Sequence, residues 1–149
     1  MPLMREMIIR RTELALEDFD ALVSRTPPDR IEWKPEGAKS VLEIVRECAE
    51  VNERWASILR NGHWVGYDLA REAPSLMPTI GIARTHLRTT TGLFTAEVRR
   101  FPQERMSVKI PVPWGEVDAF TALTWAMWHL SYHEGQVAYL QTMWGDLEE

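Results

Sequence analysis

Two histidines four residues apart are the side chains of this sequence best placed to do chemistry. His129 and His133 lie in the run from Ala126 to Leu140, whose residues favour a helix. Because one helical turn is close to four residues, both imidazoles would project from the same face, about 6 Å apart at Cβ. Two imidazoles so placed can bind one metal ion. The pair alone is a common accident, however, so a metal site also requires a third ligand and a buried setting.

The best candidates for a third ligand lie in an earlier predicted helix. Ser40-Val-Leu-Glu43 has the pattern of a capping box, and Asn61-Gly62 is a usual helix end. Projected at 100° per residue, Glu47 lies at the edge of the apolar stripe of this helix and Cys48 near its middle. We therefore predict that Glu47 is the acid that faces inward and binds the metal. Cys48 is the alternative, since a thiolate is a strong zinc ligand, although a buried cysteine is commonly a small hydrophobic residue.

Other side chains are predicted to surround this site. Gln136 shares a face with the two histidines and could orient a ligand, or simply pack at a tight helix crossing beside Gly135. The predicted pocket or outer shell of the site comprises Gln136, Trp125, Tyr132 and Cys48. The catalytic residues beyond the ligands stay unassigned, because the sequence shows no nucleophilic triad and no glycine-rich phosphate loop. Catalysis would therefore depend on the metal.

Four segments have the three-to-four spacing of amphipathic helices. They are Met4 to Arg25, Ser40 to Asn61, Pro78 to Phe101 and Val117 to Trp144. We expect a long loop with one turn of helix at most over residues 63–77, and a short extended segment over 102–115, where apolar residues alternate. This pattern predicts an all-α fold, a four-helix bundle, in a single domain over residues 1–149. Its long connectors permit crossovers as well as a simple up-down order.

Composition narrows the functional classes. The 149 residues are 45% hydrophobic and 26% charged, as expected of a chain that packs a core. A net charge of −5 gives no basic surface for nucleic acid, and no apolar run approaches the length of a membrane span. Cys48 is the only cysteine, and charged residues interrupt the apolar N-terminus before a signal-peptide core could form. The expected location is cytoplasmic.

Several motifs resemble the DinB-like family of four-helix-bundle metalloenzymes. They are Pro113-Trp-Gly115, Thr121-Ala-Leu-Thr-Trp-Ala-Met-Trp-His129, Tyr132-His133, Gly135-Gln136-Val137 and Ser40-Val-Leu-Glu-Ile-Val-Arg-Glu-Cys-Ala-Glu-Val-Asn52. The resemblance implies a bundle that is often a homodimer and that binds a divalent ion, usually nickel or zinc, through three histidines. The last two match His129 and His133, whereas the first falls on Glu47. Two histidines and a carboxylate would also admit iron or manganese.

The resemblance implies a metal-dependent enzyme acting on a small molecule. Its chemistry would be that of a thiol S-transferase, an isomerase or a hydrolase, with a low-molecular-weight thiol somewhat favoured as substrate. The metal would lower the pKa of a bound thiol or water. The alternative hypothesis is a non-catalytic stress-response or interaction domain that keeps the bundle but has lost its metal. In that case the two histidines would be bonded to carbonyls or water, and Glu47 would be a surface carboxylate.

Overall fold

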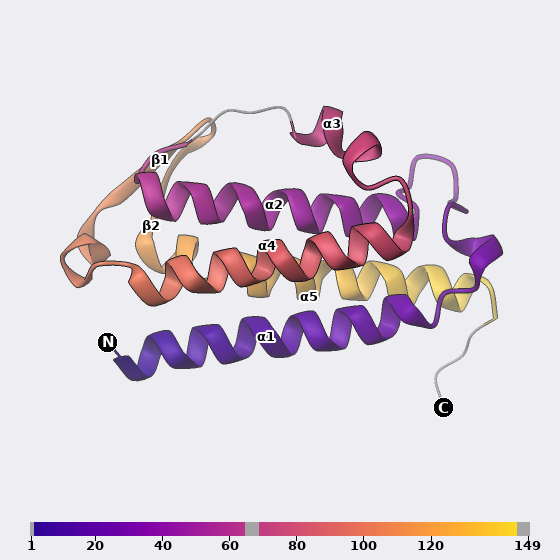
Figure 1. Cartoon of the computed structure of the whole chain (residues 1–149), viewed down its shortest axis with the longest axis horizontal. Helices are drawn as coiled ribbons and strands as arrows, with labels where there is room; N and C mark the ends of the chain where they lie inside the picture. The colour runs from indigo at the N-terminus through magenta and orange to yellow at the C-terminus, as the bar shows by residue number, and fades with distance from the viewer. Residues whose placement is uncertain (1, 65–68, 146–149) are drawn as a thin grey trace.

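The computed structural model shows a bundle of four long helices, which confirms the all-α prediction (Figure 1). The structure describes residues 2–64 and 69–145. The long helices are α1 (Pro2–Ser24), α2 (Val41–Asn61), α4 (Ile80–Arg100) and α5 (Ala119–Met143). All four coincide with the helices predicted from the apolar periodicity, to within a few residues at their ends.

The order of the helices around the bundle differs from the order along the chain. Helix α2 packs on α4 and α5, and α1 packs on the other sides of α4 and α5. Helices α1 and α5 run in one direction, whereas α2 and α4 run in the other (Figure 1). The bundle therefore contains crossover connections, which its long connectors permit. This arrangement sets α2 directly against the helix that carries both histidines.

The connectors contain more regular structure than the sequence pattern predicts. An eight-residue helix, α3 (Leu69–Leu76), occupies part of the predicted loop; residues 65–68 of that loop lie outside the described residues. Before α5, strands β1 (Lys109–Val112) and β2 (Gly115–Asp118) form an antiparallel hairpin. The prediction included an extended segment but missed its partner β2, because Gly115-Glu-Val-Asp118 has too little apolar alternation to indicate a strand. Short helical turns, η1 (Pro28–Arg30) and η2 (Gln103–Ser107), complete the connectors.

Side-chain caps set the ends of the helices. The predicted capping box is present, since Glu43 N donates to Ser40 Oγ over 3.2 Å and Ser40 N donates to the Glu43 carboxylate over 2.7 Å. Thr79 caps α4, so this helix begins two residues after the predicted Pro78. Asp118 caps α5 by accepting from Thr121 N over 2.7 Å. Helix α5 therefore begins two residues after the predicted Val117, because Val117 pairs with Ile110 in the hairpin.

The buried apolar side chains form two clusters along the bundle. One includes Phe19, Ile44, Cys48, Leu87 and Leu130. The other includes Trp55, Phe94, Ile110, Leu123 and Ala126. The two clusters meet on α5 at His129. Ala126, one turn before His129, belongs to the second cluster, and Leu130, the residue after it, belongs to the first. The polar site is thus built into the middle of a packed interior.

No helix in the described part of the chain combines the length and the apolar character that a membrane span requires.

Candidate metal centre

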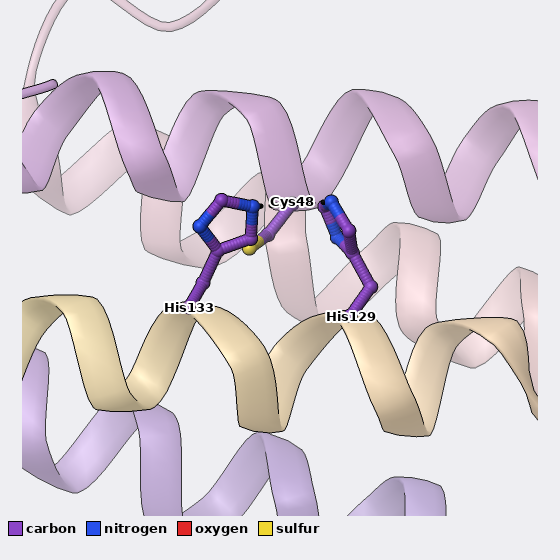
Figure 2. A group of neighbouring side chains, drawn as sticks. All are labelled: Cys48, His129 and His133. Atoms are coloured by element: carbon purple, nitrogen blue, oxygen red, sulfur yellow. Dashed lines mark hydrogen bonds between the residues drawn. The ribbon is translucent and has the colours of Figure 1, made fainter.

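The facing surfaces of α2 and α5 bring three potential metal ligands together. His129 and His133 project from consecutive turns of α5 toward α2, where Cys48 lies beside the two rings (Figure 2). The exposed fractions are 8% for His129, 3% for His133 and 0% for Cys48. A burial this deep is costly for two imidazoles unless their nitrogens find partners.

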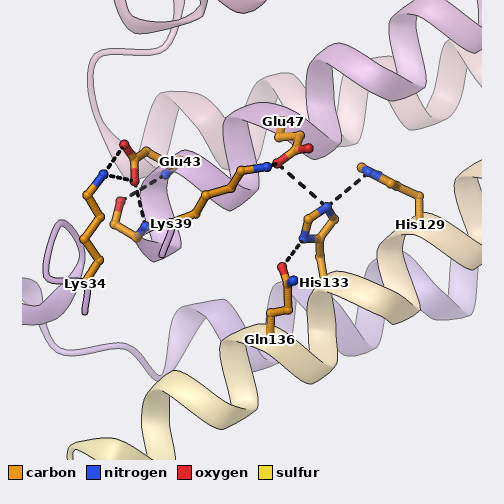
Figure 3. A network of polar contacts seen from close by, with 8 residues as sticks. Lys34, Lys39, Glu43, Glu47, His129, His133 and Gln136 are labelled. Atoms are coloured by element: carbon orange, nitrogen blue, oxygen red, sulfur yellow. Dashed lines mark hydrogen bonds and ion pairs between the residues drawn. The ribbon is translucent and has the colours of Figure 1, made fainter. Parts of the chain in front are cut away.

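The hydrogen bond between His133 and Gln136 fixes the position of a proton. His133 Nδ1 lies 2.7 Å from Gln136 Oε1, which can only accept, so Nδ1 carries the hydrogen. The lone pair of His133 is therefore on Nε2, and this atom lies 3.1 Å from Nε2 of His129 (Figure 3). Gln136 thus orients the ring of His133, which is one of the two roles that the sequence suggested for it. No comparable hydrogen bond orients the ring of His129, since its Nδ1 is buried without a hydrogen-bond partner among the described residues.

The buried setting keeps both rings neutral. Burial, reinforced by the neighbouring His133, lowers the pKa of His129 to about 4, although Glu47 opposes this shift. Burial also lowers the pKa of His133, against the opposing effects of Gln136 and Glu47. Neutral imidazoles are the form that binds metal ions. Both rings are therefore ready to bind at neutral pH without first losing a proton.

Glu47 lies at the edge of the site and already has a cationic partner. Its Oε2 is 3.8 Å from Nε2 of His133 and is also hydrogen-bonded to Nζ of Lys39 (Figure 3). Its side chain is 29% exposed, so it lies between the interior and solvent. Glu47 thus faces the histidines, but the prediction that it is the inward-facing acid of this helix is wrong, since Glu50 is buried at 6% exposure. Metal ligation by Glu47 stays a prediction.

Cys48 is closer to the centre of the site than its sequence pattern indicated. Its Sγ and one nitrogen of each histidine all lie within 4.8 Å of one another. Burial raises the pKa of the Cys48 thiol well above its usual range, and the charge of Glu47 acts in the same direction. The thiol is therefore protonated in the metal-free protein and unreactive unless a cation binds beside it.

A pocket of about 770 Å³ opens beside the histidines. Of the residues predicted to surround the site, Tyr132 and Gln136 line this pocket. Trp125 does not line it; its ring is partly buried and stacks on Trp55 with centroids 4.6 Å apart, against the apolar interior. The other lining residues include Lys39, Glu47, Trp128, His129, His133 and Tyr139. The volume is in the range of small-molecule sites, and its walls combine aromatic rings with a few polar groups.

Lys39 is the residue of the site that the sequence did not indicate. It lies in the connector before α2, eight residues from Glu47, and helical periodicity says nothing about a side chain in a connector. The only available signal was its position next to the cap residue Ser40. Residues beside a helix N-terminus lie close to the first turns of that helix, which is how Lys39 reaches Glu47.

The donors fit a divalent ion. Two nitrogens bound to one tetrahedral zinc ion at 2.0–2.1 Å would be separated by about 3.3–3.4 Å, and the two Nε2 atoms here, 3.1 Å apart, need only a small adjustment to reach it. The oxygen of Glu47 and the lone pair of His133 also approach each other with no hydrogen of either group between them. A cation would satisfy all of these electron pairs together, whereas one proton can satisfy only one pair of acceptors.

Comparisons with known proteins agree with this fold. The sequence model of the DinB superfamily matches residues 11–137. Among solved structures, YfiT from Bacillus subtilis, described as a probable metal-dependent hydrolase with an unusual four-helix bundle topology, superposes with a TM-score of 0.80 at 15% identity, covering 95% of this chain and 87% of YfiT. The DinB-like protein YjoA from Bacillus subtilis superposes with a TM-score of 0.70 at 20% identity, covering 95% of this chain and 94% of YjoA. No curated protein sequence matches the chain.

Proposed function

We propose, since the chain belongs to the DinB superfamily, that it is a divalent-metal-dependent enzyme acting on a small molecule. One observation carries the proposal: two buried, neutral histidines direct Nε2 atoms at each other over 3.1 Å beside a pocket. By itself the pair can share one hydrogen, which leaves Nδ1 of His129 buried without a partner, whereas a cation could take the lone pairs of both Nε2 atoms.

The proposed ligands are His129, His133 and Glu47. The carboxylate needs to move only a short distance to join the histidines, since its Oε2 lies 3.8 Å from His133 Nε2. Zinc or nickel suits the imidazoles, and the carboxylate extends the choice to iron or manganese. When bound, the ion would supply Lewis-acid chemistry and lower the pKa of a coordinated water or thiol.

The protein's own side chains would prepare the site and hold the substrate. Gln136 keeps the His133 proton on Nδ1, and the packed interior keeps both rings neutral. Trp128 and Tyr132, stacked with centroids 5.7 Å apart, offer an aromatic wall, and Lys39 would offer a positive charge once Glu47 leaves it to bind the ion. This pocket suits a small molecule with an apolar part and an anionic group.

Hydrolysis and thiol transfer are the two reaction classes that this chemistry serves. Both require a nucleophile, water in one case and a low-molecular-weight thiol in the other, that is ionised at neutral pH. The description of YfiT as a probable metal-dependent hydrolase supports the first, and the family resemblance supports the second.

Metal content tests the proposal and separates it from the rival hypothesis of a non-catalytic domain. Protein purified without a polyhistidine tag should contain a transition metal, or take up close to one equivalent on loading, and His133→Ala should lose it. Elemental analysis after gel filtration measures this. Less than a tenth of an equivalent, unchanged by loading and by the substitution, would favour the non-catalytic domain.

Replacement of Glu47 tests the third ligand. Restoring histidine in Glu47→His should tighten zinc or nickel binding, because imidazole is the better donor for these ions. Isothermal titration of the metal-free proteins measures the change. An affinity equal to that of the wild type would remove Glu47 from the ligands.

We also propose that the protein is a homodimer. Apolar side chains on one face of α5 are unusually exposed, at 55% for Trp128, 53% for Tyr132, 68% for Tyr139 and 48% for Met143. Their spacing of four and seven residues is that of a helix-packing face. Light scattering at micromolar concentration should give twice the mass of the chain, and a monomeric mass would contradict the proposal.

A further inference from the structure

Cys48 completes the tightest set of potential ligands in the described part of the chain. Its Sγ and the nitrogens of His129 and His133 all lie within 4.8 Å of one another, and no other set of three or more such residues is found there. In a tetrahedral zinc site, sulfur and nitrogen ligands are about 3.6 Å apart. A small side-chain adjustment therefore brings the three atoms to bonding distance of one ion.

The setting of Cys48 differs from that of Glu47, its neighbour on α2. Cys48 is fully buried, whereas the Glu47 side chain is 29% exposed. Glu47 is already neutralised by Lys39, whereas the Cys48 thiol lies beside the two neutral imidazoles. The three converging donors are thus one sulfur and two nitrogens, with the carboxylate outside them.

We propose that the Cys48 thiolate binds the same ion as His129 and His133. The Glu47 carboxylate can then exchange between binding this ion and pairing with Lys39. The inference rests on the proposed metal binding by the histidines. It adds a ligand that the family resemblance does not imply, because the resemblance places the third ligand at Glu47.

The binding step is balanced by the release of one proton. The S–H bond of Cys48 breaks, its proton passes to solvent, and the sulfur electron pair forms the bond to the ion. A thiolate and a dication leave a net charge of +1 in the interior. While Glu47 remains with Lys39, this positive charge is available to an anionic group of a substrate; when Glu47 leaves Lys39, its carboxylate can balance the charge instead.

A sulfur ligand has consequences for both metal choice and access. Thiolates select zinc, cobalt or nickel over manganese, which prefers oxygen donors. Four protein ligands would close a tetrahedral ion, as in structural sites, whereas three leave a position open, as in catalytic ones. Exchange of Glu47 between the ion and Lys39 would convert one arrangement into the other.

Cobalt(II) is the probe that distinguishes the ligands. A cobalt–thiolate bond gives a charge-transfer band in the near ultraviolet, and Cys48 is the only cysteine, so the band reports this residue alone. The metal-free protein, in a buffer without thiols, is titrated with CoCl₂ while absorbance is recorded, and calorimetry gives the stoichiometry and affinity. Matched variants are Cys48→Ala, which keeps a small apolar side chain, and Glu47→Gln, which keeps the shape of the carboxylate.

We expect the charge-transfer band in the wild type and in Glu47→Gln, and its absence in Cys48→Ala. The Kd of Cys48→Ala should rise by more than the roughly 10- to 100-fold that loss of an outer-shell partner costs. Circular dichroism checks that each variant is folded, and Cys48→Ser provides a second variant should Cys48→Ala be unstable. Cobalt bound stoichiometrically by the wild type without a charge-transfer band would overturn the inference and leave the proposed metal site intact. No cobalt bound by the wild type would overturn both.

Discussion

Two polar clusters of this bundle differ in how far their hydrogen-bonding groups find partners. Between α1 and α4, Asp20 accepts from Arg84 over 2.7 and 3.0 Å and also from Arg88. Between α2 and α5, His129 and His133 direct nitrogens at each other over 3.1 Å. The first cluster pairs an acceptor with donors, whereas in the second the two rings can share only one hydrogen and Nδ1 of His129 is left without a partner.

The pKa shifts show the same difference. Burial would raise the pKa of Asp20, but the hydrogen bonds and charges of Arg84 and Arg88 outweigh it and hold the pKa below its ordinary value. For His129, burial lowers the pKa to about 4 and no anion compensates fully. The arginines thus stabilise the charged form of their partner, whereas the histidine site excludes charge until a cation is bound. A polar cluster that completes its own hydrogen bonds serves the fold, and one that does not is a candidate for ligand binding.

The largest expected effect is on metal affinity, which should depend on the histidine cluster and not on the Asp20 cluster. The substitution His133→Ala removes one of the two facing nitrogens and should weaken zinc binding by at least about 100-fold, more than an outer-shell change does. Isothermal titration of tag-free, metal-free protein measures this. The control is Asp20→Asn, which should leave the affinity unchanged because Asp20 belongs to the other cluster. A similar loss in both variants would mean that the fold, rather than the site, was damaged.

The two clusters should contribute to folding stability over different ranges of pH. Because the pKa of folded His129 is about 4 and the unfolded value is 6.5, the unfolded chain takes up the proton first as the pH falls. The metal-free protein should therefore lose roughly 3 kcal/mol of stability between pH 6.5 and pH 4, and His133 acts in the same direction. The contribution of Asp20 should persist over this range, since its lowered pKa means that it is lost only below pH 3.8. Urea unfolding at several pH values measures both, and a flat profile from pH 6.5 to 4 would contradict the burial of neutral histidines.

Loss of the Asp20 charge tests whether this cluster holds the helices together. The substitution Asp20→Asn should lower the free energy of unfolding by about 2 kcal/mol, because Arg84, only 27% exposed, would lose its anionic partner. The matched control is Glu17→Gln on the same helix. Its ion pair with Arg10, at 3.6 Å, is exposed on both sides and should contribute less than about 0.5 kcal/mol. Equal effects of the two substitutions would remove the structural role assigned to Asp20.

The smallest expected effect concerns the partner that orients a ligand. The substitution Gln136→Ala removes the acceptor of the His133 Nδ1 hydrogen and should weaken zinc binding by roughly 10-fold. In Gln136→Glu the acceptor is retained, so the affinity should recover to near that of the wild type. Calorimetry compares the three proteins at one pH. Wild-type affinity in Gln136→Ala would show that the packed interior, rather than Gln136, holds the ring.

The sequence by itself determined the helices and the histidine pair. Apolar spacing located four helices, because amphipathic periodicity and cap residues such as Ser40 are local properties of a chain. The same locality placed His129, His133 and Gln136 on one face of α5, where the structure joins His133 to both of the others. Family resemblance then indicated metal binding, and the fold it implied is the one observed.

Only the tertiary structure decided which parts of the other elements meet this pair. The helix order in the bundle, with α2 facing α5, depends on crossover connections that no local pattern encodes. It is this contact that puts Cys48 beside the rings and leaves Glu47 at the edge with Lys39. A one-residue step on a helix turns a side chain by 100°, so the choice between a carboxylate and a thiol depends on where the neighbouring helix lies. Periodicity can rank these two residues against the core, but their distances to the histidines exist only in the assembled bundle.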